Sequence, residues 1–242
     1  MTRKILHLPE GTSSSDIIGG GTSGLAILYP GTRTVVKISH GDLDENTRCE
    51  LEAQIYELLS KSQHTRPESL LDYKGRSKCG RGILLGYAEN HTVRRYLRTH
   101  GARLPDTTVI RRWADQAARG LRFLHTNGVS HGDVTCDNFF LDEDLNVRLG
   151  DFTSSSLHLG SAQIDDDIFE FGLALYEMCT GIQPFRDSFF SVDDKRANFR
   201  EDIAPDLSEA KLGKFTNTIS KCLNAQFKDT DELLHDLSTI KM

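Results

Sequence analysis

Residues 129–151 read VSHGDVTCDNFFLDEDLNVRLGD, and this stretch decides the fold of the chain. It holds an aspartate in a His-Gly-Asp turn (Asp133), an asparagine five residues later (Asn138), and a second aspartate after two short apolar runs (Asp151). Two carboxylates and an amide on loops between short strands can bind a divalent cation through hard oxygen ligands and orient a hydroxyl for attack. The alternative is that these side chains only cap turns, but the whole string in this order disfavours it.

A glycine-rich segment lies upstream, at residues 17–24, and contains the pattern Gly-x-Gly-x-x-Gly. The apolar run 25–29 and the β-branched run 34–38, which includes Lys37, predict strands on either side of a turn at Pro30-Gly31. A glycine turn between strands differs from the strand-to-helix setting of a dinucleotide-binding fold. Taken alone, the glycines are typical of a flexible loop and the lysine of a solvated strand edge.

Apolar residues at helical spacing predict a helix over 42–60, where Glu52 lies on or next to the apolar stripe and Glu50 is a second acidic candidate. Arginines are concentrated between residues 94 and 112, and we interpret them as a solvated face in preference to a dock for an acidic partner. Further helices are predicted over 93–100, 113–127, 167–178, 211–223 and 231–240, and further strands over 70–73 and 82–85.

The composition bounds the class of protein. The chain has 242 residues, and its 38% of AVILMFWYC residues is typical of a globular protein with a sizeable core. The formal charge of −6 argues against a general nucleic-acid-binding protein. No apolar run approaches the roughly 18 residues of a membrane span, and no signal peptide is expected. The five cysteines are scattered without paired spacing, which indicates reduced thiols in a cytoplasmic or nuclear protein.

The stretch 129–151 resembles the catalytic and metal-binding loops of the eukaryotic protein kinase superfamily, whose pattern is His-Arg-Asp, Asn, a strand pair and Asp-Phe-Gly. The corresponding triplets here are His131-Gly132-Asp133 and Asp151-Phe152-Thr153. The run LHTNGV before the first triplet and the helix over 167–178 are similar to the same family. The resemblance extends over nearly the whole chain.

The resemblance implies an α+β, bilobal protein-kinase-like fold, with a small N-lobe of antiparallel sheet and one helix and a mainly helical C-lobe. It implies a single domain over residues 1–242, with the N-lobe at about 12–86 and the C-lobe at about 90–242. Nothing in the sequence indicates an oligomeric state.

The resemblance also implies ATP and Mg²⁺ as cofactors. Asp133 would accept the proton of the substrate hydroxyl, Lys37 would contact the α- and β-phosphates, and Glu52 would hold Lys37 in place. Asn138 and Asp151 would bind the metal. The implied nucleotide-binding residues are Gly19, Gly21, Gly24, Lys37, Leu85, Gly86 and Ala88.

The sequence also departs from the family pattern. Residues 134–137 supply no lysine or arginine to steady the transferred phosphoryl group. Thr153 replaces a glycine, which is expected to stiffen the metal loop because glycine alone reaches positive φ cheaply. Gly132 replaces the arginine that would pair with a phosphorylated activation loop. Only 16 positions separate Asp151 from Asp167, the acid that would brace the catalytic turn, so the platform for a peptide substrate is largely absent.

These features predict an ATP- and Mg²⁺-dependent phosphotransferase that resembles protein serine/threonine kinases and acts on a protein or peptide hydroxyl. The alternatives are a pseudokinase, acting as a nucleotide-gated binding module or scaffold, and a small-molecule kinase, since His-Gly-Asp also occurs in that class. The expected partners are ATP and an unidentified protein or small-molecule substrate, without nucleic acid or membrane.

Overall fold

The computed structural model describes residues 8–21, 24–78, 80, 82–101, 103–185, 191–202, 208 and 212–241. The chain divides into two compact units. The first comprises Met1–Arg66, Leu71–Tyr87 and Asp151–Ser155, and the second comprises Pro67–Leu70, Ala88–Gly150 and Ser156–Met242. An antiparallel five-stranded sheet and one α-helix make up the described part of the first unit, and the second unit is mainly helical, so the predicted α+β class is confirmed.

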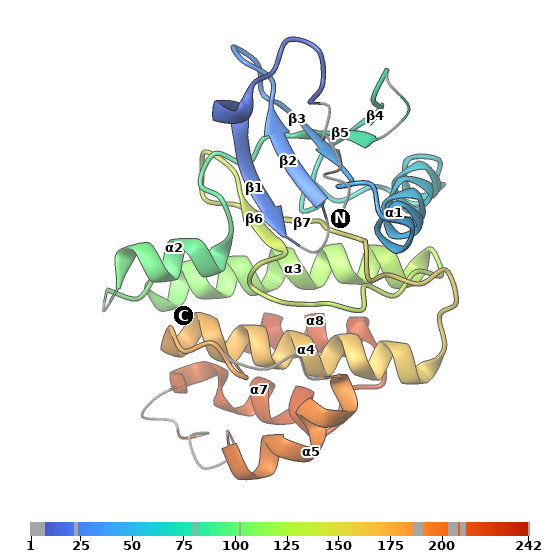
Figure 1. Cartoon of the computed structure of the whole chain (residues 1–242). Helices are drawn as coiled ribbons and strands as arrows, with labels where there is room; N and C mark the ends of the chain where they lie inside the picture. The colour runs from blue at the N-terminus through green and yellow to red at the C-terminus, as the bar shows by residue number, and fades with distance from the viewer. Residues whose placement is uncertain are drawn as a thin grey trace. The chain divides into compact units, whose positions relative to one another are not determined.

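The sheet of the first unit contains β1 (Ile17–Gly21), β2 (Gly24–Leu28), β3 (Thr34–Ile38), β4 (Tyr73–Arg76) and β5 (Gly82–Gly86), in the order β1-β2-β3-β5-β4 (Figure 1). Apolar residues of the central strands, such as Ile27 and Val36, are fully buried, because β-branched side chains pack well on a pleated surface. Lys37 lies opposite Ala26 and Ile83 in the register, and so the sheet holds it between two neighbouring strands.

The glycine-rich segment differs from its prediction. Gly19 and Gly21 lie inside β1 and not in a turn. Since β1 is an exposed edge strand, the missing side chains leave no core position unfilled. Gly24 starts β2 at φ +113°, and a Cβ there would lie 2.4 Å from the Ile38 carbonyl oxygen, so only glycine fits. The connecting residues 22–23 lie outside the described residues.

The strand predicted over 70–73 is wrong, because β4 begins only at Tyr73. Leu70 and Leu71 are buried although they precede the strand. The neighbouring Ser69 carbonyl accepts a hydrogen bond of 2.7 Å from the Leu149 N–H, within the second unit. Leu70 and Leu71 are therefore apolar because they are buried in a connecting segment, and not because they belong to a strand.

Helix α1 (Leu43–Ser60) confirms the helix predicted over 42–60. It begins where the Asp42 carboxylate accepts a hydrogen bond of 2.8 Å from the Glu45 N–H, an N-cap that satisfies a free backbone donor. Its buried face includes Ile55 and Tyr56, and the helix contacts β4 and β5. The apolar stripe of α1 is thus the surface that packs on the sheet.

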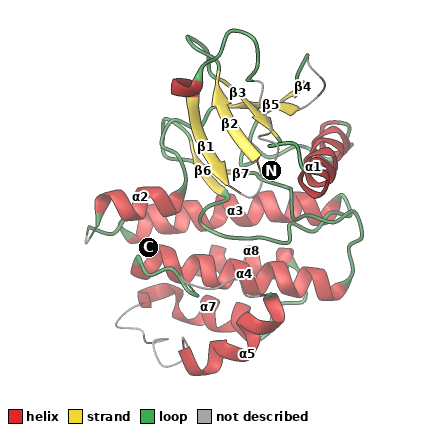
Figure 2. Cartoon of the chain, viewed as in Figure 1, coloured by secondary structure: helices red, strands yellow, loops and turns green. Residues whose placement is uncertain are grey.

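The second unit contains α2 (Val93–His100), α3 (Thr107–Thr126), β6 (Phe139–Leu141), β7 (Val147–Leu149), α4 (Ser161–Thr180), α5 (Val192–Asp202), α7 (Thr216–Leu223) and α8 (Thr230–Thr239) (Figure 2). Helix α4 contacts both α3 and α7. Every residue of α4 from Asp167 to Cys179 is buried, so this helix forms the core of the unit.

The predicted helices of the second unit are largely confirmed, with four differences. Helix α4 begins at Ser161 and not at 167. Helix α3 begins at Thr107 and not at 113, because the Asp106 side chain caps it. Helix α5 is not predicted from the sequence, since VDDKRANFRED has no apolar stripe. Helix α7 begins at Thr216, after a short 3₁₀ turn, although the prediction started at Lys211, which lies outside the described residues.

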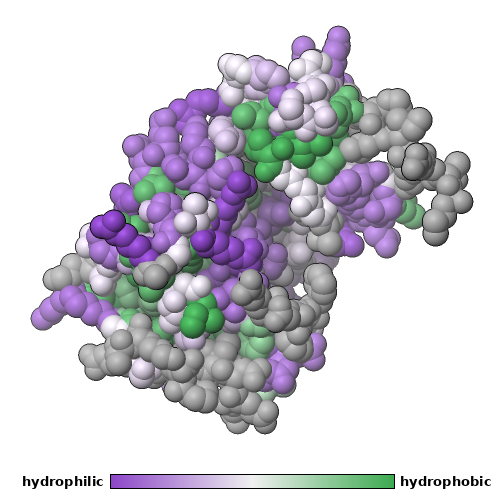
Figure 3. Space-filling view, turned by 60° about the vertical axis from the view of Figure 1, so that its left-hand side comes forward, coloured by the Kyte–Doolittle hydropathy of each residue, from purple (hydrophilic) through white to green (hydrophobic). Residues whose placement is uncertain are grey.

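The helices and the molecular surface add two observations. Among the residues that the structure describes, none of the helices has the length and apolarity needed to cross a bilayer. On the face drawn in Figure 3, hydrophilic side chains predominate and hydrophobic ones form separate small areas.

Burial raises the pKa of Cys49 to about 11 and that of Cys179 to about 12, which disfavours reactive thiolates. Cys136 and Cys222 are also free and buried, whereas Cys79 lies outside the described residues.

Candidate active site

The first unit contains a buried ion cluster around Lys37. The Lys37 Nζ lies 2.8 Å from Glu52 Oε2 and 2.8 Å from Asp151 Oδ1. Lys37 and Glu52 are buried, with exposed fractions of 9% and 1%. Burial opposes the charged form of the lysine, but the two carboxylates outweigh that effect and raise the pKa of Lys37 above its ordinary value. The structure therefore brings three of the residues predicted for the site together as a charged group.

Local structure explains why Glu52, and not Glu50, reaches the lysine. Glu52 lies on the buried face of α1, one turn before Tyr56. Glu50 lies on another face and is exposed, where it binds the Arg76 guanidinium at 2.7 Å. Helical spacing alone thus separates a cluster residue from a surface ion pair.

The segment after Asp151 also belongs to the first unit. Asp151 itself adopts φ +63°, whereas Thr153 does not have a positive φ. The position that replaces the family glycine therefore does not need a positive φ, and the stiffening expected from Thr153 stays a prediction. The Thr153 Oγ1 donates a hydrogen bond of 2.7 Å to Asp151 Oδ1, so the same oxygen receives Lys37 and Thr153. The Phe152 N–H donates to Glu52 Oε1 at 3.2 Å, which ties the segment to α1.

We expect Thr153→Val to lower the free energy of unfolding by about 1 kcal/mol or more, because Asp151 loses a hydrogen bond to a charged acceptor. Valine has the same shape and Thr153 is buried, so packing should be kept. Urea unfolding is the measurement, and Thr153→Ser, which keeps the hydroxyl, is the matched control. Equal unfolding free energies for the two variants would show that the hydroxyl contributes nothing.

The loop 131–138 lies in the second unit and is held from α4. The Asp167 carboxylate accepts hydrogen bonds of 2.8 Å from the His131 N–H and the Gly132 N–H. The same carboxylate accepts from His125 Nε2 at 2.8 Å. A carboxylate that accepts several N–H bonds in a buried position fixes the backbone around it. The turn before Asp133 is therefore rigidly placed.

Asp133 and Asn138 form a second pair within this loop. The Asn138 Nδ2 donates to the Asp133 carbonyl and to Asp133 Oδ2, each at 2.8 Å. Asn138 is buried and Asp133 is partly exposed. The asparagine thereby orients the aspartate, whose carboxylate can accept a proton from a hydroxyl.

The residues predicted to bind an adenine lie at the end of β5 and just after it. Leu85 is buried inside β5, and the Gly86 N–H donates to the Asp72 carbonyl at 2.7 Å. Ala88 is the first residue of the second unit's segment Ala88–Gly150, and its carbonyl accepts from the His91 N–H at 3.2 Å. Of the predicted glycines, Gly19 and Gly21 lie on β1 and Gly24 begins β2.

Two buried ion pairs of the second unit were not predicted from the sequence, and Arg94, interpreted with the other arginines as part of a solvated face, is instead buried. The Arg94 guanidinium binds both oxygens of Glu177 at 2.7 Å, and Lys195 binds Glu170 at 2.5 Å. The two acids lie on α4, in its part from residue 168 to residue 179, which is otherwise nearly all apolar. Charged residues in such a helix are almost never buried without a partner. Two acids within an apolar helical run could therefore have predicted buried ion pairs, although the run does not identify the cations that bind them.

Comparison with known proteins gives the family. The family described as "Protein kinase domain" matches residues 14–166. "Serine/threonine-protein kinase Nek3" from Oryza sativa subsp. japonica is 29% identical over 171 residues, which is 60% of this chain and 28% of that protein. "Phytosulfokine receptor 2" from Arabidopsis thaliana is 30% identical over 215 residues, which is 75% of this chain and 20% of that protein. The chain thus spans well under half the length of these relatives.

The matched region contains the elements described above. It includes the first three strands, α1 with Glu52, the loop 131–138 and Asp151. The same residues form the Lys37 cluster and the Asp133–Asn138 pair. Since the family match covers more than half of the chain, the chain belongs to the protein kinase domain family.

Proposed function

We propose that this protein is an ATP- and Mg²⁺-dependent phosphotransferase that transfers the γ-phosphoryl group to a hydroxyl of a protein or peptide. The observation that carries the proposal is the buried Lys37, which Glu52 and Asp151 hold at 2.8 Å each. Burying charges is costly unless they are paired. A cluster of this kind supports a functional role because phosphate groups require a fixed cation.

The other roles follow from the loop 131–138. Asp133, oriented by Asn138, would accept the proton of the substrate hydroxyl. The glycines of β1 and β2 would approach the phosphates, and the adenine would bind at Leu85, Gly86 and Ala88. The whole of residues 1–242 would act as one domain. The scattered spacing of the cysteines supports a cytoplasmic or nuclear location.

Asn138 and Asp151 would hold the magnesium ion, because each side chain carries an oxygen atom of the kind that this ion prefers. Asn138 turns its amide nitrogen to Asp133, which makes the amide oxygen the ligand atom. Asp151 supplies a carboxylate, and carboxylate and amide oxygens are the hard ligands that Mg²⁺ prefers. When bound, the ion would neutralise charge on the phosphate oxygens.

A calorimetric titration tests the proposal. ATP should bind more tightly in magnesium than in EDTA, and Asp151→Asn should remove most of the difference. A phosphotransfer assay on a mixture of protein substrates then follows with the same preparation. Equal ATP affinity with and without magnesium would contradict the metal role, and binding without any transfer would contradict the enzyme activity.

Activity should not require phosphorylation of the segment after Asp151. Regulation of that kind needs a new anion paired with a cation, and Gly132 offers no side chain for such a pair. Ser155 is buried, so it is poorly placed for modification. Phosphatase treatment, checked by mass spectrometry, should leave the transfer rate unchanged. A tenfold loss, about 1.4 kcal/mol of barrier, would contradict this prediction.

A further inference from the structure

Helix α4 holds the loop 131–138 at two places. Asp167 binds the two N–H groups just before Asp133. Glu170 lies one turn further along α4, and its Oε2 accepts a hydrogen bond of 2.8 Å from the Val134 N–H, directly after Asp133. Residues three apart on a helix share a face. One face of α4 therefore accepts hydrogen bonds from the backbone on both sides of Asp133.

Glu170 is a buried acid with a partner from a different helix. Its exposed fraction is 2%, and its second oxygen, Oε1, lies 2.5 Å from the Nζ of Lys195 on α5. Burial raises the pKa of Glu170, and Lys195 opposes that shift and so favours the carboxylate. A charged acceptor binds an N–H about twice as strongly as a neutral one. The carboxylate thus links the loop to α5.

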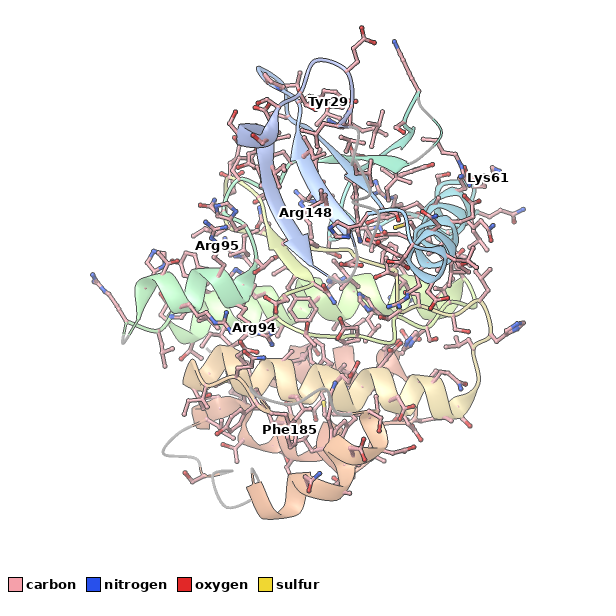
Figure 4. The ribbon with its side chains drawn as sticks, in the orientation of Figure 1. Tyr29, Lys61, Arg94, Arg95, Arg148 and Phe185 are labelled. Atoms are coloured by element: carbon pink, nitrogen blue, oxygen red, sulfur yellow. The ribbon has the colours of Figure 1, made fainter. Side chains whose placement is uncertain are left out.

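The neighbouring ion pair of Arg94 and Glu177 does not neutralise Glu170, so Lys195 does. Arg94, Glu177, Glu170 and Lys195 line one small cavity beside Thr135. Arg94 reaches from α2 to α4 (Figure 4), where it binds both Glu177 oxygens and also Asp137. Its guanidinium therefore already serves two other carboxylates. Within this cavity, Lys195 is the cation that balances the charge of Glu170.

We propose that Glu170 and Lys195 are positioning residues for Asp133, so that α5 takes part in the phosphotransfer reaction through the loop 131–138. The inference rests on the proposed function, because Asp133 is the group being positioned. With Lys195 lost, Glu170 would be an unpaired buried acid, and its bond to Val134 would weaken. Small displacements of a reacting group lower the rate strongly without changing the nucleotide contacts.

The chain offers a matched control on the same helix. Arg196 is adjacent to Lys195 and also binds α4, with its Nη2 3.0 Å from Asp166 Oδ1 and its guanidinium 4.4 Å from the centre of the Phe169 ring. In the described part of the chain, the ion pair and the ring contact of Arg196 are both with α4 and not with the loop 131–138. Arg196→Met therefore weakens the docking of α5 without touching the Glu170 link.

The experiment compares kcat and the KM for ATP in Lys195→Met, Lys195→Arg and Arg196→Met. Lys195→Met should lower kcat about tenfold or more with an unchanged KM. Lys195→Arg should retain most of the wild-type rate, and Arg196→Met should stay close to wild type. Equal losses of kcat in Lys195→Met and Arg196→Met would overturn the proposal, because both would then act by undocking α5.

Hydrogen–deuterium exchange separates this inference from the proposed function. Peptides covering residues 131–136 should exchange faster in Lys195→Met, and also in Glu170→Leu, than in Arg196→Met. Unchanged exchange in Lys195→Met overturns the positioning role whether or not the wild-type protein transfers phosphate. Faster exchange in a protein without transfer activity would support the loop contact and contradict the proposed function alone.

Discussion

Replacing Asp133 by asparagine is expected to lower the phosphotransfer rate by about 10²–10⁴-fold, the usual contribution of general acid–base catalysis. Asparagine has the same shape and can still accept the hydrogen bond that Asn138 Nδ2 donates at 2.8 Å. It cannot take a proton from a substrate hydroxyl, so the loss should fall on kcat. Initial rates of transfer and a calorimetric ATP titration measure the two effects separately.

The control for this variant is Asp137→Asn, which makes the same chemical change in the same loop. Asp137 is exposed and forms an ion pair with Arg94, away from the role assigned to Asp133. We expect it to retain most of the wild-type rate. If Asp133→Asn transferred phosphate nearly as fast as wild type, Asp133 would not be the base.

Lys37→Met is expected to abolish most of the activity and also to destabilise the first unit by about 3–5 kcal/mol, the usual cost of leaving one partner of a buried ion pair alone. Sequence reasoning gives a different expectation, in which a lysine facing a phosphate site matters mainly for ligand binding. The two expectations differ because Glu52, the partner of Lys37, has an exposed fraction of only 1% and would be left as a buried charge without that lysine. Urea unfolding without nucleotide measures the stability, and the transfer assay measures the activity.

Two further variants show whether the loss of stability in Lys37→Met comes from Glu52 being left buried without its cation. Lys74→Met removes an exposed strand lysine whose Nζ donates hydrogen bonds to the Arg33 carbonyl and Thr34 Oγ1, and it should cost little stability. Adding Glu52→Gln to Lys37→Met should recover part of the stability, since the buried charge is gone. The double variant should remain inactive. A Lys37→Met protein as stable as Lys74→Met would contradict the structural role of the cluster.

Strong local signals made much of the fold predictable. The helix over 42–60 has a capping aspartate and an apolar stripe, so its bounds agree with α1 almost to the residue. The run 167–178 is too apolar to lie on a surface, and it forms the buried core of α4. The string 129–151 placed Asp133, Asn138 and Asp151 on loops because turn residues punctuate its short apolar runs.

The local sequence pattern did not predict the structure where residues are buried without pairing in a strand, or where a helix has no apolar stripe. The apolar residues at 70–71 are buried as a connecting segment, and sequence cannot distinguish that from strand pairing. Helix α5 carries mostly polar residues, so it has no periodic signal of its own. It was the tertiary structure that showed it docked on α4 through Lys195 and Arg196.

The sequence by itself determined which residue types lie near Asp133 and Lys37 along the chain, because strings such as HGDVTCDN are local. Only the tertiary structure decided which acids face which cations. Glu52 and Glu50 differ by two positions, yet one is buried against Lys37 and the other is exposed beside Arg76. Glu170 and Lys195 meet across 25 positions. Pairing between distant side chains depends on how helices and strands pack, and that geometry is set by the whole core and not by neighbouring residues.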